Sequence, residues 1–462
     1  MARKPALCPA SLVCLLIGLV LLSSVVPSSH AETLSYSLTL PLDDVRVGTE
    51  LGYTTIQVSS SNYELFSEEG SPELPFRIVN VLLPQGQLID SFSFVAGPGV
   101  VLTDAAKVKT AGASVTEDGT VGKGASLVSA PEEATTFPGT YGRYLGTGFL
   151  HGRAIASFAV FPLELNGSEL ALHQEIRLDI VTVEGADKWK PVVRERYRKN
   201  FQEKVARTLS GFVINPDLNA GYHFDEVKVE KKEGGFQPTS YPSLEGSPVD
   251  YLIITTDALA AEFQRLADWK TEKGVPTVVR TVEFIEANTR NGVDLQETIR
   301  NFIKDAYAKW GITYVLLGGD TDVLPPRYAL SRFYLGGTEL PVDMYFSCLD
   351  GSWNDTHDKF WGEGVNVIPF DNPDLYPELY NGRAPFSTTS EVSTMIDKII
   401  AYETPCDMSY QDKYLFLAEV LFPVDWKDPD PISLNGADFA QFVDSNSLSG
   451  KPLDVVKMFE TD

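Results

Sequence analysis

Basic residues are scarce in this chain of 462 residues, in which 38 lysines and arginines stand against 63 aspartates and glutamates. The resulting formal charge of −25 argues against nucleic acids and anionic membranes as partners, because both repel an acidic surface. The same acidity suits cation binding or simple solubility. Hydrophobic residues make up 43% of the chain, which is enough for substantial cores, and the length suggests roughly two or three domains.

Cysteine is equally scarce, with four in the chain, and two of these, Cys8 and Cys14, lie in the apolar N-terminal segment. Cys348 and Cys406 remain, which excludes a disulfide framework as the basis of the fold. One bridge between these two or two free thiols are both compatible with the sequence.

Long apolar runs are confined to the N-terminus. Arg3 and Lys4 precede "LVCLLIGLVLLSSVV", and Ser29-His30-Ala31 then provides a small-x-small cleavage pattern. This layout predicts a secretory signal peptide over 1–31, cleaved after Ala31, and therefore a secreted or cell-surface protein. A retained membrane anchor is the alternative, but the run is short for a membrane span. We expect no transmembrane segment after removal of the signal.

Alternating apolar and polar residues fill the first half of the chain. Runs such as "LSYSLTL", "FRIVNVLLP" and "IRLDIVTVE" have the period of half-buried strands and are separated by turn residues. They predict a β-rich domain over 32–226, with a long exposed loop at 110–127. Residues 227–248 mix charge, glycine and proline without an apolar period, which indicates an inter-domain linker open to proteolysis.

From residue 249 onward, buried strands alternate with amphipathic helices. "VDYLIITT", "VPTVVRTV" and "TYVLLGG" are separated by segments with helical spacing, and a further helix and strands follow up to 462. Short connections between such elements predict an α/β domain with a mostly parallel sheet over 249–462. The last run, "LDVVKMFETD", begins a strand, so this sheet is expected to be incomplete.

Acidic residues follow one of these strands and recur further along. Asp320 comes directly after Gly318 and Gly319, which would let the backbone bend there. Ligands of open α/β sheets bind beyond the carboxyl ends of the strands, so Asp320 is a candidate site carboxylate, although a turn aspartate is the commoner reading. Asp371, Asp374 and Glu378 cluster on a segment that contains prolines. Such oxygens suit calcium, while acidic loops are often only solvated.

Three longer stretches together resemble the catalytic domain of the gingipain family of cysteine peptidases. They are "YLIIT…LADWKTEKGV", "LQETIRNFIKDAYAKWGITYVLLGGD" and "YPELYNGRAPFST…IDKIIAYE". The upstream β-rich region, with "GSPELP", resembles the propeptide of that family. The resemblance implies a propeptide domain followed by the N-terminal part of a caspase-like α/β domain. The propeptide would assist folding and mask the active face until cleavage in the linker.

The resemblance also implies a structural calcium ion. Asp320, Asp374 and Glu378 match side-chain ligands of the family, whereas Asp371 and Tyr376 match positions that bind through backbone carbonyls. On this hypothesis the ion joins the end of a strand to the segment 371–378.

The catalytic pair of the family is missing from these residues. None of the five histidines lies in a Gly-His-Gly stretch, and both remaining cysteines precede the expected position of the dyad. A substitute pair of His357 with Cys348 or Cys406 does not fit the expected strand ends. We therefore expect the dyad beyond Asp462, a truncated chain without peptidase activity, and Asp438 as the nearest match to an acid that binds the substrate side chain.

Two functions of different classes follow. The first is an exported precursor of a gingipain-like cysteine endopeptidase, which cleaves protein or peptide substrates through thiolate attack in its complete form. The second is a secreted, non-catalytic module that calcium stabilises and that binds proteins or surfaces. A metallohydrolase is a weaker alternative, because the sequence has no His-rich zinc spacing.

Overall fold

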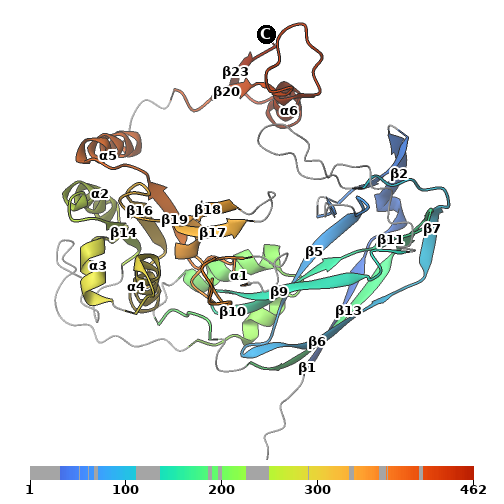
Figure 1. Cartoon of the computed structure of the whole chain (residues 1–462), viewed down its shortest axis with the longest axis horizontal. Helices are drawn as coiled ribbons and strands as arrows, with labels where there is room; N and C mark the ends of the chain where they lie inside the picture. The colour runs from blue at the N-terminus through green and yellow to red at the C-terminus, as the bar shows by residue number, and fades with distance from the viewer. Residues whose placement is uncertain are drawn as a thin grey trace, which may run out of the picture.

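The computed structural model describes residues 32–50, 52–60, 62–66, 71–110, 136–185, 190–195, 200–224, 249–289, 291–331, 338–363, 371, 373–404 and 409–461. The predicted signal peptide and linker lie outside these residues, as does all but the first residue of the predicted loop at 110–127. We call the described residues up to 224 the β-rich domain and those from 249 the α/β domain (Figure 1).

Antiparallel strands make up most of the β-rich domain, as the alternating pattern predicted. Its strands are β1 (Glu32–Thr39), β2 (Val45–Glu50), β3 (Tyr53–Val58), β4 (Glu64–Leu65), β5 (Pro75–Leu82), β6 (Gln87–Ala96), β7 (Gly99–Thr103), β8 (Thr136–Phe137), β9 (Gly142–Leu150), β10 (Arg153–Val160), β11 (Leu163–Asn166), β12 (Glu169–His173) and β13 (Glu175–Glu184). Its helical segments are η1 (Leu42–Asp44), α1 (Phe201–Phe212) and η2 (Pro216–Gly221).

Two of its sheets enclose the main core of this domain. One has the order β1-β13-β6 and the other β4-β5-β10-β9. Every second residue of β13 points inward, so Ile176, Leu178 and Ile180 are buried against Val81 and Phe158. A third sheet, β7-β12-β11-β8, and the pair β2-β3 carry a second core. Burial on one face of each sheet explains the period-two pattern of the sequence.

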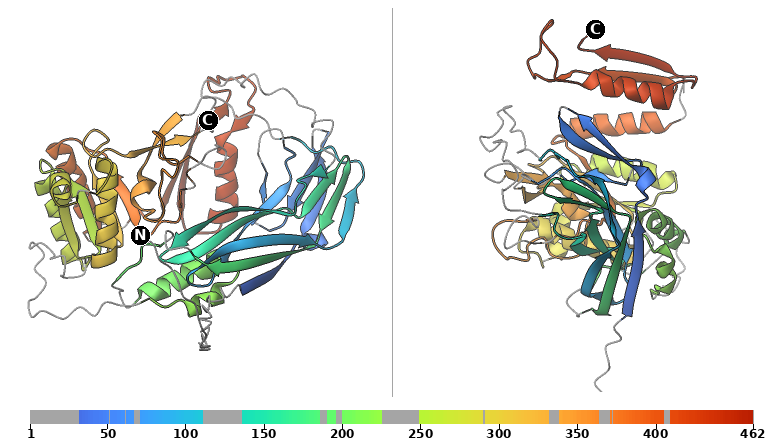
Figure 2. Two further views of the ribbon diagram at one scale, coloured as in Figure 1. Left: turned by 60° about the horizontal axis from the view of Figure 1, so that its bottom comes forward. Right: turned by 90° about the vertical axis from the view of Figure 1, so that its right-hand side faces the viewer.

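Helix α1 lies against the β9–β10 hairpin and the neighbouring strand β5. Val205 and Leu209 are its buried residues, and they contact Leu150 and Ile155 of the two strands. The hairpin turn, His151-Gly152, has positive φ angles of 51° and 81°. This end of the β-rich domain points toward the α/β domain (Figure 2).

The α/β domain begins as the sequence predicts, with strands and helices in alternation. Its elements are β14 (Tyr251–Thr255), α2 (Ala260–Glu272), β15 (Thr277–Thr281), α3 (Val282–Asn288), α4 (Leu295–Trp310), β16 (Tyr314–Gly318), β17 (Arg327–Ser331), β18 (Thr338–Val342), η3 (Asp343–Phe346), β19 (Tyr380–Ala384), α5 (Thr389–Glu403), β20 (Lys413–Ala418), β21 (Val420–Phe422), β22 (Leu434–Asn435), α6 (Gly436–Val443), the π-helical turn η4 (Asp444–Leu448) and β23 (Asp454–Phe459).

A parallel sheet of order β15-β14-β16-β19 forms the centre of this domain. Helices α2 and α5 cover one face and α3 and α4 the other (Figure 1). Helix α4 shows why its sequence is helical. The side chain of Asp294 accepts the N–H of Glu297 at its start, Gly311 ends it at a φ of 75°, and Ile299, Ile303 and Ala306 form its buried stripe.

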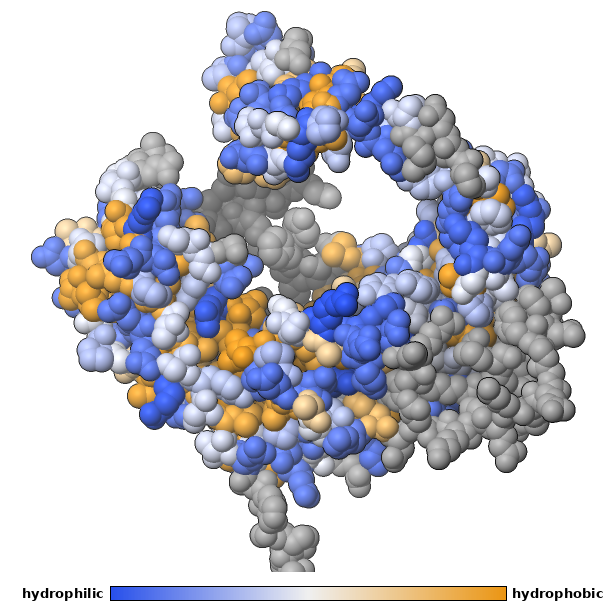
Figure 3. All heavy atoms as spheres, turned by 180° about the vertical axis from the view of Figure 1, so that it is seen from behind, coloured by the Kyte–Doolittle hydropathy of each residue, from blue (hydrophilic) through white to orange (hydrophobic). Residues whose placement is uncertain are grey.

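Strands β20 and β23 lie outside this central sheet. They pair with each other in parallel and form a two-stranded sheet that α6 contacts. The prediction of one continuous sheet is wrong for these two strands among the described residues. Leu417 is 69% exposed and Met458 59% exposed, because no second layer formed by the described residues covers these side chains. Apolar side chains are accordingly visible on the unit at the top of Figure 3.

None of the described helices is both long enough and apolar enough to cross a membrane.

Candidate functional site

The parallel strands give the central sheet two distinct edges. Tyr314 is paired with Tyr380, and Gly318 with Ala384, so β16 and β19 run side by side in the same direction. Residues that precede the strands meet at what we call the amino edge, and residues that follow them meet at the carboxyl edge. The acidic residues predicted from the sequence divide between these two edges.

Asp320 lies at the carboxyl edge, in the turn after β16. Its side chain accepts the N–H of Thr321 at 2.7 Å, and its carbonyl accepts the N–H groups of Val323 and Leu324. Its own N–H donates to the carbonyl of Phe386 at 3.2 Å. Asp320 therefore shapes a turn, which is the alternative that the sequence left open.

The two glycines before Asp320 permit close packing rather than an unusual backbone angle. A Cβ atom on Gly318 would lie 2.7 Å from the ring of Phe263, and one on Gly319 would lie 2.7 Å from Val323. Neither glycine has a positive φ. The chain does bend here, at Gly319 and in the turn that follows, as the sequence predicts. The glycines also let α2 and this turn approach the strand.

Arg383 of β19 organises the carboxyl edge. It forms a bidentate ion pair with Asp343, with N–O distances of 2.6 and 2.7 Å. The same guanidinium donates to the carbonyls of Gly319 and Leu324, both at 2.7 Å. The planar fork of arginine suits this combination of carboxylate and carbonyl acceptors. The turn that contains Asp320 is therefore fixed to β19.

Asp374 lies at the amino edge and joins the two domains. Its Oδ2 accepts the N–H of Phe149, in β9 of the β-rich domain, at 2.6 Å, and its Oδ1 accepts the N–H of Tyr376 at 3.0 Å. The hydroxyl group of Tyr376 lies 2.6 Å from the hydroxyl of Ser157 in β10. This segment therefore contacts the hairpin through both an acid and an aromatic side chain.

Glu378 and Asp350 repeat the same kind of contact. Oε1 of Glu378 accepts the N–H of His151 at 3.4 Å, and its Oε2 accepts the N–H of Leu349 at 2.8 Å. Oδ1 of Asp350 accepts the N–H of Val192 at 2.5 Å. Asp350 and Glu378 are 1% and 2% exposed. Three buried acids of the α/β domain thus each accept a backbone N–H of the β-rich domain.

Burial changes the protonation of this group. It raises the pKa of Asp350 to about 7 and the pKa of Asp374 to about 6, and it also raises the pKa of Glu378. The neighbouring negative charges add to the effect on Asp350 and Glu378, whereas the N–H donors oppose it.

Two basic side chains, Arg300 and Lys304, lie close to these acids. Arg300 is buried and donates to the carbonyls of Cys348 and Asp350 at 2.6 and 2.9 Å. Burial lowers the pKa of Lys304 to about 8. Arg300 and Lys304 therefore supply positive charge that partly compensates the acids, as buried charges require.

Further contacts hold the same edge. Arg194 donates to the carbonyls of Gly311 and Ile312 at 3.0 and 2.6 Å, and its guanidinium lies over the ring of Tyr307. Nδ1 of His151 lies 3.0 Å from the hydroxyl of Tyr307. Burial, together with the nearby arginines, lowers the pKa of His151 to about 3. These contacts lie at the amino edge, so they do not mask the carboxyl edge, where ligands of such sheets bind.

The predicted calcium ligands are therefore not brought together as one set. Asp320 lies beside Phe386, whereas Glu378 precedes β19 at its other end. These ends are separated by about 25 Å at 3.3 Å per residue, and calcium ligands lie within about 2.6 Å of the ion. Asp371 instead accepts the N–H of Thr356 and of Glu363.

One ion cannot contact all five predicted residues, so the proposed link between the strand end and the segment 371–378 is wrong. Within the described part of the chain, no group of three or more His, Cys, Asp or Glu side chains is placed to hold a metal. Calcium itself is untested and stays a prediction.

The thiol of Cys348 is not suited to nucleophilic attack. Its side chain is completely buried, and burial together with the charges of Glu378 and Asp374 raises its pKa, which opposes thiolate formation. His357 lies on an exposed loop, where Nδ1 is 2.8 Å from the carbonyl of Asp355. Cys406 lies outside the described residues.

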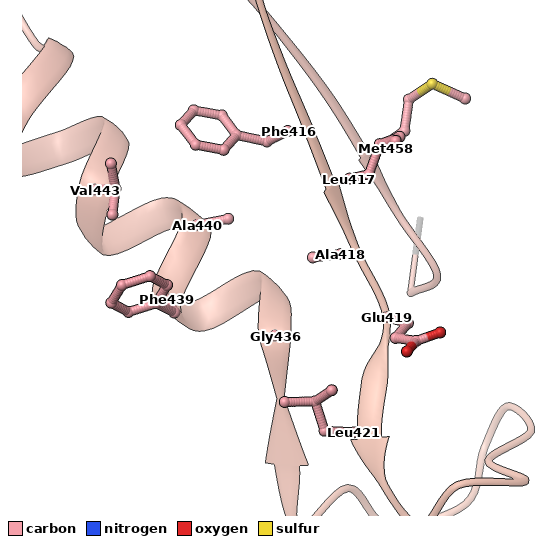
Figure 4. A pocket seen from close by; sticks show the side chains of 10 residues that line it. All are labelled: Phe416, Leu417, Ala418, Glu419, Leu421, Gly436, Phe439, Ala440, Val443 and Met458. Atoms are coloured by element: carbon pink, nitrogen blue, oxygen red, sulfur yellow. The ribbon is translucent and has the colours of Figure 1, made fainter. Parts of the chain in front are cut away.

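An apolar cavity of about 600 Å³ lies between α6 and β20 (Figure 4). It is lined by Phe416, Leu417, Ala418, Glu419, Leu421, Gly436, Phe439, Ala440, Val443 and Met458. Asp438 is on the same helix but is exposed and does not line the cavity. The role of Asp438 in substrate binding therefore stays a prediction.

Comparison with known proteins decides the kinship of the α/β domain. Residues 245–461 match the model of the family "Peptidase family C25". This part of the chain belongs to peptidase family C25.

The chain resembles "Lys-gingipain W83" of Porphyromonas gingivalis, with 26% identity over 187 residues, which are 39% of this chain and 9% of the relative. It resembles "Gingipain R2" of P. gingivalis strain ATCC BAA-308 / W83, with 24% identity over 166 residues, 36% of this chain and 18% of the relative. The chain therefore covers only a small share of these family C25 members.

Two solved structures also match in part. The "Complex of Porphyromonas gingivalis RgpB pro- and mature domains" is 18% identical with a TM-score of 0.31, and the match covers 46% of this chain and 42% of that one. The structure titled "Structural insight into zymogenic latency of gingipain K from Porphyromonas gingivalis" is 14% identical with a TM-score of 0.26, over 34% of this chain and 93% of that one.

Sequence reasoning missed several residues that shape the amino edge of this family C25 domain. The stretch 349–363 is acidic and contains no helix or strand, yet Asp350, Trp353 and Glu363 are buried. No local pattern separates Asp350 from Asp355 or Asp358, which follow on the same stretch. Arg194 lies in the basic stretch 188–200 and is only 2% exposed. Its burial could not be predicted locally, because the carbonyls to which it donates are distant in sequence.

Proposed function

We propose that this chain is the precursor form of an exported cysteine endopeptidase related to the gingipains. In this proposal residues 1–31 direct export, residues 32–226 form the propeptide, and residues 249–462 form the N-terminal part of the peptidase domain. The complete enzyme would cleave peptide bonds of protein substrates through a thiolate that attacks the carbonyl and forms an acyl-enzyme.

The observation that carries this proposal is the match of 245–461 to family C25, joined to a β-rich domain that docks on the matched part. The names of the relatives, Lys-gingipain and gingipain R, favour substrates with basic side chains. The acidic balance of the chain is compatible with such substrates.

Thiolate attack needs a cysteine and a histidine placed next to each other. The cysteines and histidines of this chain do not show that arrangement among the described residues. Cys348 is buried with a raised pKa, and no histidine of the chain lies in a Gly-His-Gly stretch. We therefore propose that the pair is encoded beyond codon 462 and that the chain as given does not hydrolyse peptides.

Two measurements test the proposal. The purified chain is incubated with fluorogenic Arg and Lys peptides, and no turnover is expected. Turnover that the substitution Cys406→Ala abolishes would overturn the assignment of the dyad. The gene is then sequenced beyond codon 462. A reading frame that continues into Gly-His-Gly and then a cysteine supports the peptidase.

A stop codon at that position, together with absent turnover, would favour the second candidate, a secreted binding module without catalysis. The observation that favours this candidate is the burial of Cys348, which raises the pKa of its thiol and opposes thiolate formation.

A further inference from the structure

Three backbone N–H groups of the β-rich domain end on three carboxylates of the α/β domain. Phe149 donates to Asp374 and His151 to Glu378, both from the β9–β10 hairpin. Val192, which lies outside the hairpin, donates to Asp350. We call Asp350, Asp374 and Glu378 the carboxylate clasp.

Gly148 brings the hairpin close enough for this arrangement. A Cβ atom at Gly148 would lie 2.5 Å from the ring of Tyr376 and 2.6 Å from Oδ1 of Asp374. Real Cβ atoms do not approach so closely, and the buried Asp374 and the half-buried ring of Tyr376 leave little room to move. Only a residue without a side chain allows the strand to lie against the segment 374–376.

We propose that the carboxylate clasp is the anchor by which the peptidase domain holds its propeptide, with Gly148 as the position that sets the closeness of the two domains. This inference rests on the proposed function, because it takes the β-rich domain to be the propeptide.

Because the donors are backbone N–H groups, this anchor depends on the backbone shape of the β-rich domain more than on the identity of its side chains. Every non-proline residue carries an N–H, so recognition requires that the hairpin present its amides at the right positions. The tight His151-Gly152 turn and the missing side chain at 148 meet this requirement. Hydrogen bonds from N–H groups to carboxylates are short and strong compared with neutral ones.

The hydrogen bonds of the acids explain why separation is unfavourable. Without the β-rich domain, Asp350 and Glu378 would lose N–H donors while the remaining structure still holds them close to one another. Oδ2 of Asp350 already lacks a hydrogen-bond partner among the described residues. Docking is therefore coupled to the hydrogen bonds of the clasp, because these donors are lost when the domains separate.

Hydrogen–deuterium exchange on the full chain tests the anchor. Gly148→Ala places a methyl group against Tyr376 and Asp374, whereas the matched control Gly97→Ala meets only ordinary contacts at 3.5 Å in the same domain. We expect the amides of Phe149, His151 and Val192 to exchange about ten- to a hundredfold faster in Gly148→Ala. We expect no change in Gly97→Ala. Unchanged exchange in Gly148→Ala would overturn the proposal.

A second pair of variants acts on the other side of the interface. Asp374 accepts an N–H from the other domain, whereas the equally buried Asp371 accepts only from residues of its own domain, Thr356 and Glu363. Asp374→Asn places an amide NH₂ against the N–H groups, so exchange at Phe149 and Val192 should rise about tenfold. Asp371→Asn should leave both amides protected.

The pair of variants also covers a failure of Gly148→Ala to fold. If Gly148→Ala also speeds exchange in β14 and β16, that variant is unfolded as a whole, and the test then depends on Asp374→Asn. Equal exchange of the hairpin amides in Asp374→Asn and Asp371→Asn would overturn the proposed anchor. The readout is independent of peptidase activity. If the exchange rates contradict the anchor while the gene encodes a Gly-His-Gly stretch and a cysteine beyond codon 462, only this inference is rejected. If the exchange rates support the anchor but no such residues are encoded, only the proposed enzyme is rejected.

Discussion

The two edges of the central sheet use acidic residues in different ways. At the amino edge, Asp350, Asp374 and Glu378 are buried and accept backbone N–H groups from a second domain. At the carboxyl edge, Asp320 is half-buried and bonds only within its own turn and to the carbonyl of Phe386. The comparison teaches that an acid close to a strand end is no sign of a ligand site until its donors are known.

The largest effect is expected where buried charge is densest, at the amino edge. Arg300→Met removes a guanidinium that donates to the carbonyls of Cys348 and Asp350 and faces the clasp. Loss of one partner in a buried charged group costs about 3–5 kcal/mol, so the urea midpoint should fall strongly. Arg265→Met is the control, because that arginine is paired on the surface. An equal midpoint in both variants would show that the amino edge is not held by charge.

A smaller effect is expected at the carboxyl edge. Arg383→Met removes the ion pair with Asp343 and the bonds to the carbonyls of Gly319 and Leu324. We expect a loss of about 2–3 kcal/mol in unfolding free energy. Exchange should accelerate in the turn after β16, while the β9–β10 hairpin stays protected. Equally faster amide exchange in the turn and in the hairpin would show that the two edges unfold together, which contradicts the difference drawn between them.

Much of the fold follows from the sequence because its determinants are local. The stripe of α4 and its cap at Asp294 are readable within one segment, and so is the alternation that buries Ile176, Leu178 and Ile180 in β13. Helix α3 was not predicted, since Val282–Asn288 is only seven residues long and follows β15 without a turn signal. The separation of β20 and β23 was also missed, because pairing between strands depends on partners distant in the chain.

The candidate site was predictable only in part, for the same reason. Asp374 and Glu378, which the sequence predicts as calcium ligands, are both buried, and their role as ligands stays a prediction. Their partners, Phe149 and His151, lie 225 and 227 residues earlier in the chain. No spacing rule connects such positions. The sequence around Gly148 also does not indicate why glycine is needed there, because its close contacts are with Asp374 and Tyr376. The sequence therefore identified acids but not what they bind.

A pH-dependent effect is expected away from both edges, between α2 and α5. Burial alone would raise the pKa of Glu403, but hydrogen bonds from Lys270, Lys273 and Trp269 outweigh it and lower the pKa from 4.5 to about 2. A lowered pKa stabilises the fold above pH 4.5, and this contribution is lost as the pH falls toward 2.

The melting temperature should therefore drop between pH 4.5 and 2, and the drop should be smaller in Glu403→Gln. Glu286→Gln, at an exposed position of α3, is the matched control and should follow the unsubstituted chain. The same acid sensitivity in Glu403→Gln would show that another group carries it.

The smallest effect is expected from calcium and from Asp320. A single ion cannot join Asp320 to Glu378 across the length of the strands, and the acids at the amino edge already accept N–H groups. Any stabilisation by calcium is therefore expected to be small, with melting temperatures in calcium chloride and in a chelator that differ by about 1 °C at most. The shift for Asp320→Asn should also lie below about 1 °C. A stabilisation by calcium that Asp374→Asn removes, with Asp320→Asn unaffected, would place an ion at the amino edge and show that the clasp exchanges its amide donors for a cation.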